Sequence, residues 1–355
     1  MPKYAERTFK SWFRERERNR RTEEQGTDEQ KKEIENRTGK QGRQNDENKA
    51  TANPEFQTPK QNKVILWADT FNNYFLPQTL VAGVEVLEAA GFEVIVPKKS
   101  MCCGRPLYDF GMLKTAKRML LDIMENLYDE IRDGVPIVGL EPSCVAVFRD
   151  ELHNLFPHNE QASRLSKQVF TLGEFLERKA PDFQIPEMHR KALVHGHCHH
   201  RSVMGVENEK KILEKTNLAY EVLPTTCCGM AGYFGYEKGS HYDVSIKAGE
   251  QLLLPKVREA DADTVIVTDG FSCREQIEQE TDRKGLHLAQ VLQMGMREQR
   301  GEHTGALPEK RFVDGMALKN PHKLRNRVLL LGAVGIGFLL FSWLKKGGEL
   351  LTDAV

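Results

Sequence analysis

Two pairs of adjacent cysteines stand out in this 355-residue sequence, one in "SMCCGRP" at residues 100–106 and one in "PTTCCGMAG" at residues 224–232. Each pair precedes a glycine, and each is followed by another cysteine further along the chain. Thiolates are soft ligands that suit zinc or iron–sulfur clusters. The seven cysteines are Cys102, Cys103, Cys144, Cys198, Cys227, Cys228 and Cys273. A metal centre is therefore the first chemistry that the sequence indicates.

The later group of cysteines makes the stronger candidate site. Its members are Cys198, Cys227, Cys228 and Cys273. Two successive thiolates strain the backbone if both bind one tetrahedral ion, whereas a multi-iron cluster offers each of them a different metal atom. Gly229 permits a close turn against such a cluster, and Gly104 has the same place after the first pair. These residues predict an iron–sulfur cluster of the 4Fe-4S type, with structural zinc or buried structural cysteines as alternatives.

Composition narrows the setting of this site. Adjacent cysteines and an odd cysteine count argue against a disulfide framework, so a reducing compartment fits better. Lys and Arg total 51, as do Asp and Glu. Because the net charge is zero, the electrostatic field of the whole protein gives no reason to expect nucleic acid as a partner.

From residue 63 onward, short apolar runs alternate with longer amphipathic ones. The apolar runs predict buried strands at 64–69, 92–97, 136–142, 192–197, 220–225 and 264–270. The amphipathic patterns predict helices at 77–90, 111–132, 162–179, 207–216 and 242–260. This alternation indicates an α/β fold with a largely parallel sheet, in which ligands gather at the carboxyl ends of the strands.

The pattern of strands and cysteines occurs twice. The paired cysteines recur after 125 residues and the cysteine downstream of them recurs after 129. Such an internal repeat indicates duplication of a whole domain. We therefore predict two tandem parallel-sheet domains, at 63–185 and 186–300.

Over about residues 63–300 the sequence resembles proteins with the cysteine-rich CCG domain. The two "CCG" motifs carry this resemblance, with "GLEPSCVAVFRDEL", "HGHCHHRSVMG" and "TDGFSCREQI" around them. The domain occurs as a tandem pair in the B subunit of heterodisulfide reductase and in iron–sulfur subunits of glycolate oxidase, lactate-utilisation and anaerobic glycerol-3-phosphate dehydrogenase complexes. More narrowly, "YAERTFKSWF", "ADTFNNYFLPQT" and "TTCCGMAGYFGYE" are similar to the C-terminal part of large FAD-linked oxidases of the D-2-hydroxyacid dehydrogenase type.

The resemblance implies an iron–sulfur electron-transfer subunit of an oxidoreductase. The sequence has no flavin domain and no ferredoxin-like run of cysteines. FAD is therefore expected only on a partner chain, an FAD-linked oxidase or ferredoxin-domain protein that acts on a 2-hydroxyacid, unless the chain is a fragment of a larger fused protein. The expected acceptor is quinone or a membrane redox partner. The alternatives are a cysteine-site disulfide reductase of the heterodisulfide reductase type and a non-catalytic zinc-stabilised scaffold.

Both halves depart from the family pattern, in which each half ends in a C-x-x-C pair. Only Cys144 remains of that pair in the first half and only Cys273 in the second. The first half also lacks the upstream cysteine, since the aligned "ADTFNN" offers only Asp69 or Asn72 as a ligand. We expect this degenerate half to bind no metal, to line a substrate pocket, or to hold a second cluster or zinc. The candidate ligands there are Cys102, Cys103, Cys144 and Asp69, and the candidate pocket residues are Arg105, Glu141 and Arg149.

Four histidines surround Cys198 in "HGHCHH" at residues 195–200. Side chains that alternate along a strand and its turn do not all face one point, which argues against a separate histidine metal site. We expect one or two of them to support the cluster or a substrate through hydrogen bonds. His197 and His199 are the candidates for this role.

The segments on either side of the repeats suggest a tethered protein. Aromatic spacing predicts a docking helix at 1–13, and the polar run at 14–62 predicts a disordered linker. After a second linker at 301–327, the 17 uncharged residues at 328–344 predict a transmembrane tail anchor. We therefore expect a single-pass protein of the cell membrane with a cytoplasmic main domain.

Overall fold

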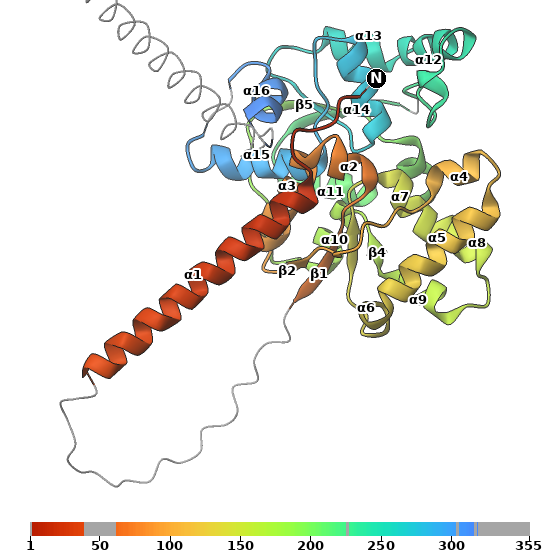
Figure 1. The fold of residues 1–355 in the computed structure, drawn as a ribbon. Coiled ribbons are helices and arrows are strands. Elements are labelled where there is room, and N and C mark those ends of the chain that lie inside the picture. The colour runs from red at the N-terminus through yellow and green to blue at the C-terminus, as the bar shows by residue number, and fades with distance from the viewer. Residues whose placement is uncertain (1, 39–61, 225–226, 303–304, 316–317, 319–355) are drawn as a thin grey trace, which may run out of the picture. The chain divides into compact units, whose positions relative to one another are not determined.

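The computed structural model describes residues 2–38, 62–224, 227–302, 305–315 and 318, which contain two α/β repeats (Figure 1). The first repeat has a parallel sheet in the order β2-β1-β3-β4, and the second has a parallel sheet in the order β6-β5-β7. The strands are β1 (Lys63–Trp67), β2 (Glu93–Ile95), β3 (Ile137–Gly139), β4 (Val169–Phe170), β5 (Lys191–Val194), β6 (Ala219–Val222) and β7 (Val265–Val267). The predicted α/β class with two parallel-sheet repeats is confirmed.

Helices connect the strands and cover the sheets (Figure 1). In the first repeat they are α2 (Thr70–Tyr74), α3 (Pro77–Ala89), α4 (Arg105–Asp109), α5 (Leu113–Asn126), α6 (Tyr128–Arg132), α7 (Pro142–Ala146), η1 (Val147–Glu151), α8 (Leu152–Leu155), α9 (Glu160–Gln168) and α10 (Leu172–Lys179). In the second they are η2 (His200–Met204), α11 (Glu207–Lys215), η3 (Phe234–Tyr236), α12 (Ser240–Glu250), α13 (Leu253–Glu259), α14 (Phe271–Glu280) and α15 (Leu288–Glu298). Helices α1 (Phe9–Thr38) and α16 (Pro308–Gly315) flank the repeats in the sequence.

The two sheets share one connectivity. In the first, β1 lies between β2 and β3, and in the second, β5 lies between β6 and β7. Leu286 forms a parallel bridge with Val267, at the place that β4 has beside β3. Since all paired strands are parallel, their carboxyl ends lie at one edge of each sheet, and the loops that carry the cysteines begin there.

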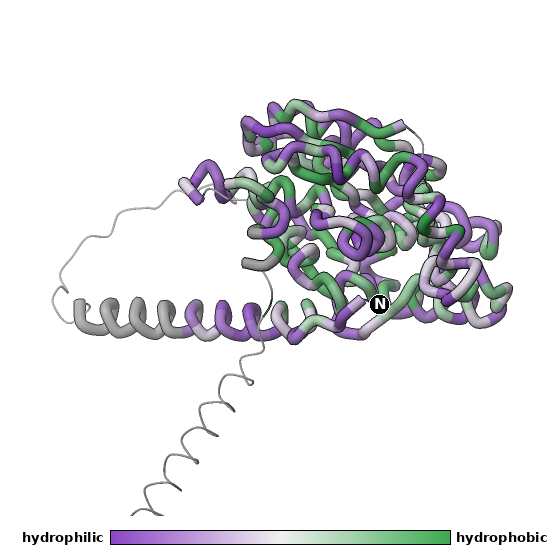
Figure 2. The backbone as a smooth tube through the Cα atoms, turned by 90° about the horizontal axis from the view of Figure 1, so that it is seen from above, coloured by the Kyte–Doolittle hydropathy of each residue, from purple (hydrophilic) through white to green (hydrophobic). Residues whose placement is uncertain are grey.

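Each repeat buries its own hydrophobic core, and hydrophobic residues gather inside the repeats (Figure 2). The first core contains Cys103 and Cys144 beside residues such as Ile65. The second contains Cys228 and Cys273. The cores therefore anchor one cysteine of each adjacent pair together with the cysteine downstream of it.

Buried hydrogen bonds join the two repeats at the carboxyl ends of their strands. The guanidinium of Arg274, in α14, donates to Thr79 Oγ1 at 2.8 Å and to Asn72 Oδ1 at 2.9 Å. Glu141, directly after β3, accepts the backbone N–H of Phe271 at 2.9 Å. Helix α15 also packs against α3, and α11 packs against α10. The strand ends of the two sheets thus face each other, and the cysteine loops of both repeats lie near this junction.

A short strand interrupts the helix that the sequence predicted at 162–179. Helix α9 ends at Gln168, and the two residues of β4 then pair with β3. Thr171 begins α10 with a capping box, in which its side chain and that of Glu174 each accept a backbone N–H of the other residue. A strand of two residues is too short to produce a period-2 signal in the sequence, so the prediction joined the two helices.

The N-terminal helix contacts this chain itself. Phe9 and Phe13 are buried, and Lys10 Nζ donates to the carbonyls of Pro97 and Lys99 at 2.8 and 2.7 Å. The predicted docking helix therefore has a docking surface on the first repeat, along the loop that leads to Cys102.

The helix begins at Phe9, later than predicted, and it extends beyond its predicted end. Disorder was expected from residue 14, but α1 continues to Thr38, and Arg16 pairs with Glu88 at 2.7 Å. Glu, Arg, Lys and Gln favour helices even where few apolar residues are present, so the composition that suggested disorder is also compatible with a helix. Residues 39–61 of the predicted linker lie outside the described part.

The predicted linker at 301–327 contains a helix as well. Helix α16 buries Phe312, and its Glu309 forms a buried ion pair with Arg283 at 2.5 Å. The transmembrane anchor predicted at 328–344 lies outside the described residues. In the part of the chain that the structure describes, no helix combines the length and the apolar character needed to span a membrane.

Candidate metal centre

The first repeat brings its three cysteines together. The sulfur atoms of Cys103 and Cys144 lie 3.1 Å apart, and both side chains are buried. Cys102 is half-buried, and its hydrogen bond with Cys103, reinforced by burial, raises the pKa of its thiol. The hydrogen bond with Cys103 lowers the pKa of Cys144, but burial and the nearby carboxylates of Asp69 and Glu141 raise it to about 11. Without a metal these groups are protonated thiols.

The four cysteines of the second repeat come after its three strands. Cys198 follows β5, the pair of Cys227 and Cys228 follows β6, and Cys273 follows β7. Despite a hydrogen bond with Cys227 that lowers it, the pKa of Cys228 is raised by its hydrogen bond with Cys273 and by burial. Cys198 is close enough to Cys227 for the charge of one to affect the pKa of the other. These pairwise interactions link the four cysteines that the sequence grouped as one candidate site, and their role as metal ligands stays a prediction.

The cysteine set of the second repeat fits a thiolate-bound metal group. All seven cysteines are free, and two thiolates bound to one tetrahedral ion lie roughly 3.8 Å apart. Cys103 and Cys144 are closer than this, at 3.1 Å, so metal binding there requires the sulfurs to separate by less than 1 Å. In kind and number, the four thiols of the second repeat match zinc or an iron–sulfur cluster, whereas the first repeat is one thiol short.

In the first repeat, a hydroxyl group stands at the place of the missing fourth cysteine. Thr70 stands where the second repeat has Cys198, and its side chain hydrogen-bonds to Cys102, which lowers the pKa of that thiol. The predicted oxygen ligand, Asp69, instead accepts the backbone and side-chain N–H groups of Asn72 at 2.9 and 2.8 Å. Burial raises the pKa of Asp69 to about 6. Asp69 thus caps α2, and Thr70 is the residue that the sequence interpretation passed over.

The three residues suggested for a substrate pocket all have protein partners. Arg105 pairs with Glu151, and Arg149 pairs with Glu174 at 2.5 Å. Glu141 accepts from the backbone of Phe271. These contacts hold the first repeat and the junction together, and the substrate pocket stays a prediction.

Gly229 is required by close packing as well as by its backbone conformation. Its φ is +95°, and a Cβ atom there would lie 2.0 Å from the carbonyl oxygen of Ser245 in α12. Its N–H donates to Cys227 Sγ at 3.3 Å. Gly104 has a φ of +80°, but the nearest atom to a Cβ there, in Ala116, would be 3.7 Å away. The two glycines have the same left-handed backbone conformation, but only Gly229 packs closely against another helix.

Gly229→Ala is expected to be far more harmful than Gly104→Ala. The left-handed conformation costs an alanine about 1–2 kcal/mol at either position. At Gly229 overpacking adds to this, for a total loss of about 2–5 kcal/mol in the free energy of unfolding. Urea unfolding monitored by circular dichroism measures both losses. Equal losses in the two variants would show that the contact with Ser245 is unimportant.

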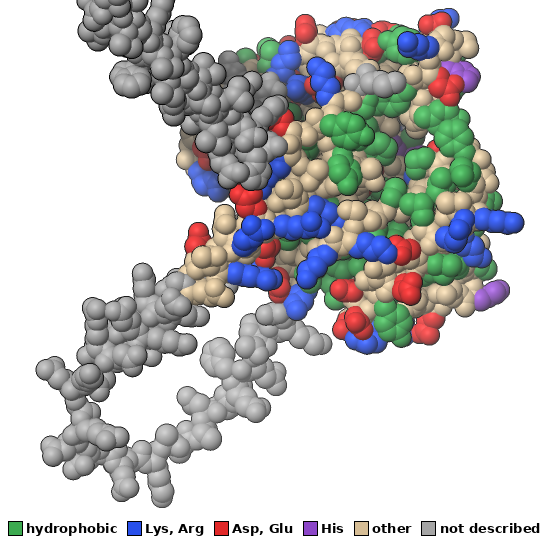
Figure 3. All heavy atoms as spheres, in the orientation of Figure 1, with side chains coloured by type: hydrophobic (Ala, Val, Ile, Leu, Met, Phe, Trp, Pro, Cys, Tyr) green, Lys and Arg blue, Asp and Glu red, His purple; other side chains and the backbone are tan. Residues whose placement is uncertain are grey.

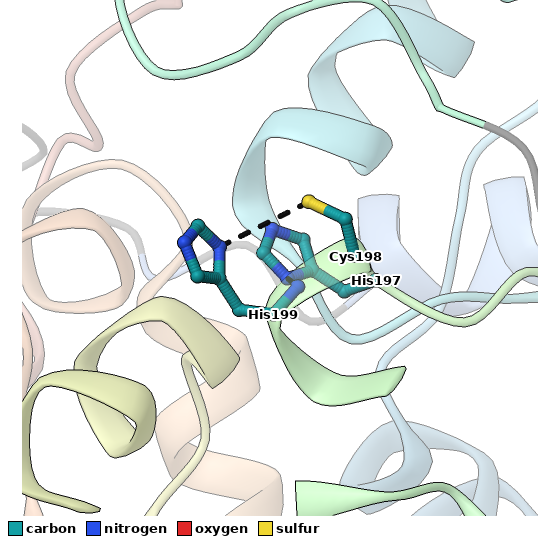
Figure 4. A group of neighbouring side chains, drawn as sticks. All are labelled: His197, Cys198 and His199. Atoms are coloured by element: carbon teal, nitrogen blue, oxygen red, sulfur yellow. Dashed lines mark hydrogen bonds between the residues drawn. The ribbon is translucent and has the colours of Figure 1, made fainter. Parts of the chain in front are cut away.

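His197 and His199 lie on the turn around Cys198 (Figure 4). His197 Nδ1 accepts the backbone N–H of His199 at 3.2 Å, and the two rings stack with centroids 5.4 Å apart. The ring of His197 is buried against Gly270, where a Cβ would lie 2.1 Å from the ring. Burial lowers the pKa of His197 to about 3 and that of His199 to about 4, so both are neutral at pH 7. Cys198 Sγ lies 3.9 Å from His199 Nδ1.

Residues of the first repeat also contribute to this environment. Arg105 lies close enough to lower the pKa of His199 and of His197, while Asp109 raises that of His199. Sequence reasoning did not place these residues beside Cys198, because they come from the other repeat and belong to α4. The rings of Phe110, at the end of α4, and Tyr233, in the loop after the second cysteine pair, stack with centroids 4.4 Å apart. This contact also brings α4 close to that loop.

An exposed hydrophobic patch lies beside these loops. We define it as Phe110, Met112, Leu113 and Tyr233, whose exposed fractions range from 41% to 57%. Figure 3 shows hydrophobic side chains gathered on the face that carries α4 and α12. Exposed apolar surface of this kind commonly marks a contact with another molecule.

Comparison with known proteins agrees with the duplication. The model of the cysteine-rich domain CCG matches residues 70–149 and 193–278. Lactate utilization protein A of Halalkalibacterium halodurans is 30% identical over 249 residues, which are 65% of this chain and 96% of that protein. The protein of the same name from Bacillus subtilis is 28% identical over 247 residues, 65% of this chain and 98% of that protein.

A third relative is longer than the matched region. The C subunit of anaerobic glycerol-3-phosphate dehydrogenase from Escherichia coli (strain K12) is 27% identical over 245 residues, which are 66% of this chain and 61% of that protein. The match thus spans less than two thirds of that relative. Taken with the two sheets and their cysteine loops, these similarities show that the chain belongs to the family of paired cysteine-rich CCG-domain proteins that includes the lactate utilization proteins A.

Proposed function

We propose that this chain is the iron–sulfur electron-transfer subunit of an oxidoreductase, with a cluster of the 4Fe-4S type in its second repeat. The observation that supports this most strongly is the convergence of four free thiols there, against three thiols and a threonine in the first repeat. The four ligands are Cys198, Cys227, Cys228 and Cys273. A cluster held by four thiolates supplies one-electron transfer at a potential that its surroundings set.

The protein's own residues shield the site on one side and open it on the other. Cys228 and Cys273 are buried in the second core, while Cys198 and Cys227 are exposed. The N–H of Gly229 donates to Cys227 Sγ, and hydrogen bonds to cysteine sulfur are among the factors that tune such a site. Exposed sulfur atoms next to the hydrophobic patch give an electron-transfer partner a short approach.

The partner in this proposal is a flavoprotein that carries the FAD. The resemblance to FAD-linked oxidases supports this, and the name of the E. coli relative says that it is one subunit of a dehydrogenase. The relatives named for lactate utilization support a 2-hydroxyacid such as lactate as the substrate of that partner. We further propose that residues 328–344 tether the chain to the cell membrane, with the repeats in the cytoplasm and quinone or a membrane redox protein as acceptor.

Iron and acid-labile sulfide analysis of the full chain, purified without oxygen, tests the proposal. We expect about four iron and four sulfide per chain and an EPR signal after reduction. One equivalent of zinc without iron would contradict the electron-transfer function and favour a zinc-stabilised scaffold. An EPR signal that changes on adding a disulfide substrate would instead favour a disulfide reductase.

A further inference from the structure

We propose that the first repeat is a redox-active thiol site, in which Cys103 and Cys144 form a reversible disulfide bond and Cys102 is the thiol that reacts with other molecules. A small disulfide compound is the oxidant, and a small thiol reverses the reaction. The inference goes beyond the proposed function, because it concerns the repeat that is one thiol short of a metal site and does not require a cluster in the second repeat.

The closeness of two buried sulfur atoms supports this bond. Cys103 Sγ and Cys144 Sγ are 3.1 Å apart, and the two side chains are 2% and 5% exposed. A disulfide bond is about 2.05 Å long, so the two atoms must approach each other by about 1 Å. Because both side chains are buried, an outside molecule does not easily reach either sulfur, whereas the two sulfurs reach each other.

The loop that carries Cys103 can make this movement. Cys144 lies in α7, and Glu141 before that helix is held by a backbone N–H of α14 in the other repeat. Cys103 instead lies in the loop between β2 and α4. The nearest atom to a Cβ on Gly104 in this loop would be 3.7 Å away, against 2.0 Å for Gly229 in the corresponding loop. The closing movement therefore falls on the less tightly packed loop and not on α7.

Cys102 connects the buried pair to the surface. It is half-buried, and its thiol forms a hydrogen bond with Cys103. The three thiols thus form a row, in which Cys102 contacts Cys103 and Cys103 contacts Cys144. Access is one of the factors that decide which thiol exchanges with a disulfide, so an outside compound reacts first at the Cys102 end of the row.

The row allows a stepwise exchange in which the bonds balance. The Cys102 thiolate attacks a compound RSSR, binds one RS group and releases the other as RS⁻. Cys103 then attacks the sulfur of Cys102 and displaces the second RS⁻. Cys144 attacks the sulfur of Cys103 and frees Cys102. Two thiol protons pass to the released RS⁻ groups, so two protein thiols are oxidised and one RSSR is reduced to two RSH.

The intermediate in this exchange favours its last step. A disulfide between the adjacent residues Cys102 and Cys103 strains the backbone, and strained disulfides are more easily reduced. Cys144 lies against Cys103 and can displace Cys102 from it. The stable product is therefore the bond between Cys103 and Cys144.

The second repeat has the same row of thiols and a fourth thiol beside it. Cys227, Cys228 and Cys273 are joined by hydrogen bonds in the same order, and Cys198 lies close to Cys227. The proposed cluster would occupy all four thiolates and so prevent their exchange. Thr70, which stands at the place of Cys198, thus leaves the first row free for thiol chemistry.

Reaction of the full chain with oxidised glutathione tests the inference. The protein is purified without oxygen and treated at about pH 8, because the thiolate is the attacking species. We expect about two equivalents of glutathione to be released per chain, one from each side of the disulfide compound. After the remaining thiols are blocked, mass spectrometry should find the peptides of Cys103 and Cys144 joined, and dithiothreitol should separate them. Absence of this joined peptide, or a joined peptide whose fragments contain Cys102 in place of Cys103, would overturn the inference.

Three variants distinguish the roles of the thiols. Cys144→Ser should accumulate glutathione on Cys102, because the last attacking thiol is missing. Cys102→Ser should form the same disulfide at least about tenfold more slowly, since the oxidant must reach a buried sulfur. Cys273→Ser is the matched control in the second repeat and should still join Cys103 to Cys144. An unchanged rate in Cys102→Ser would refute the role of Cys102, and loss of the joined peptide in Cys273→Ser would refute the separate chemistry of the first repeat.

Metal analysis of the same samples separates this inference from the proposed function. Iron or zinc that is present in the unaltered protein and lost in Cys144→Ser would place a metal on these thiols and overturn the inference. A disulfide between Cys228 and Cys273 in the unaltered protein would contradict the cluster of the second repeat and leave the inference standing.

Discussion

Cys273→Ser is expected to abolish the iron and acid-labile sulfide of the full chain, whereas Cys144→Ser is expected to leave both unchanged. Cys273 belongs to the complete set of four thiols, in contact with Cys228. Cys144 belongs to the set in which Thr70 replaces a cysteine and Asp69 is occupied by Asn72. Iron and sulfide per chain, measured after anaerobic purification, distinguish the two repeats directly.

The pair of variants is matched in its structural effect. Cys144 and Cys273 are both buried, with exposed fractions of 5% and 1%, and each lies beside the second cysteine of the adjacent pair. Replacing the buried thiol with the hydroxyl of serine should therefore destabilise each repeat by a similar amount. Unfolding of the two variants monitored by circular dichroism can check this. Equal loss of iron from both variants would mean that the first repeat also holds a cluster, and full retention of iron in Cys273→Ser would refute the assigned ligand set.

The place of the cysteines after the strands could be predicted, because it depends on local order along the chain. A cysteine that comes a few residues after a buried parallel strand lies near the carboxyl edge of its sheet whatever else the fold does. Cys198 after β5 and Cys273 after β7 follow this rule. Because the pattern repeats after 125–129 residues, the cysteines of the first half are predicted to lie at the same edge of their own sheet.

The environment of the cysteines could not be predicted, because it depends on contacts between the repeats. Arg105 influences His199 from the other repeat, and Arg274 reaches Asn72 across 202 positions of the chain. In the sequence, "FSCREQIEQE" resembles an exposed helix. Hydrophobic periodicity detects buried apolar residues, so it does not reveal a charged residue that a distant segment buries. Asp69 was misjudged for a related reason, because its role as a helix cap is decided by the position of Asn72.

Arg274→Met is expected to lower the free energy of unfolding by about 3–5 kcal/mol, the usual cost of removing one member of a buried set of charges. Arg274 is 4% exposed. Burial lowers the pKa of its guanidinium, and the nearby carboxylates of Glu141, Asp269 and Asp69 raise it. Without Arg274 these carboxylates are buried with less compensation, and Thr79 Oγ1 and Asn72 Oδ1 lose the N–H groups that they accept. Urea unfolding at pH 7 measures the loss.

Arg164→Met provides the control for removing an arginine without breaking the junction. Arg164 pairs with Glu160 at 2.6 Å on an exposed face of α9, with exposed fractions of 47% and 78%, so its loss should cost at most about 1 kcal/mol. Arg274→Lys keeps the charge but lacks the planar fork that reaches both acceptors, and it should have an intermediate effect. A loss below 1 kcal/mol in Arg274→Met would show that the junction does not depend on this charge. A loss as large in Arg274→Lys as in Arg274→Met would show that hydrogen-bond geometry, and not the charge, holds the two repeats together.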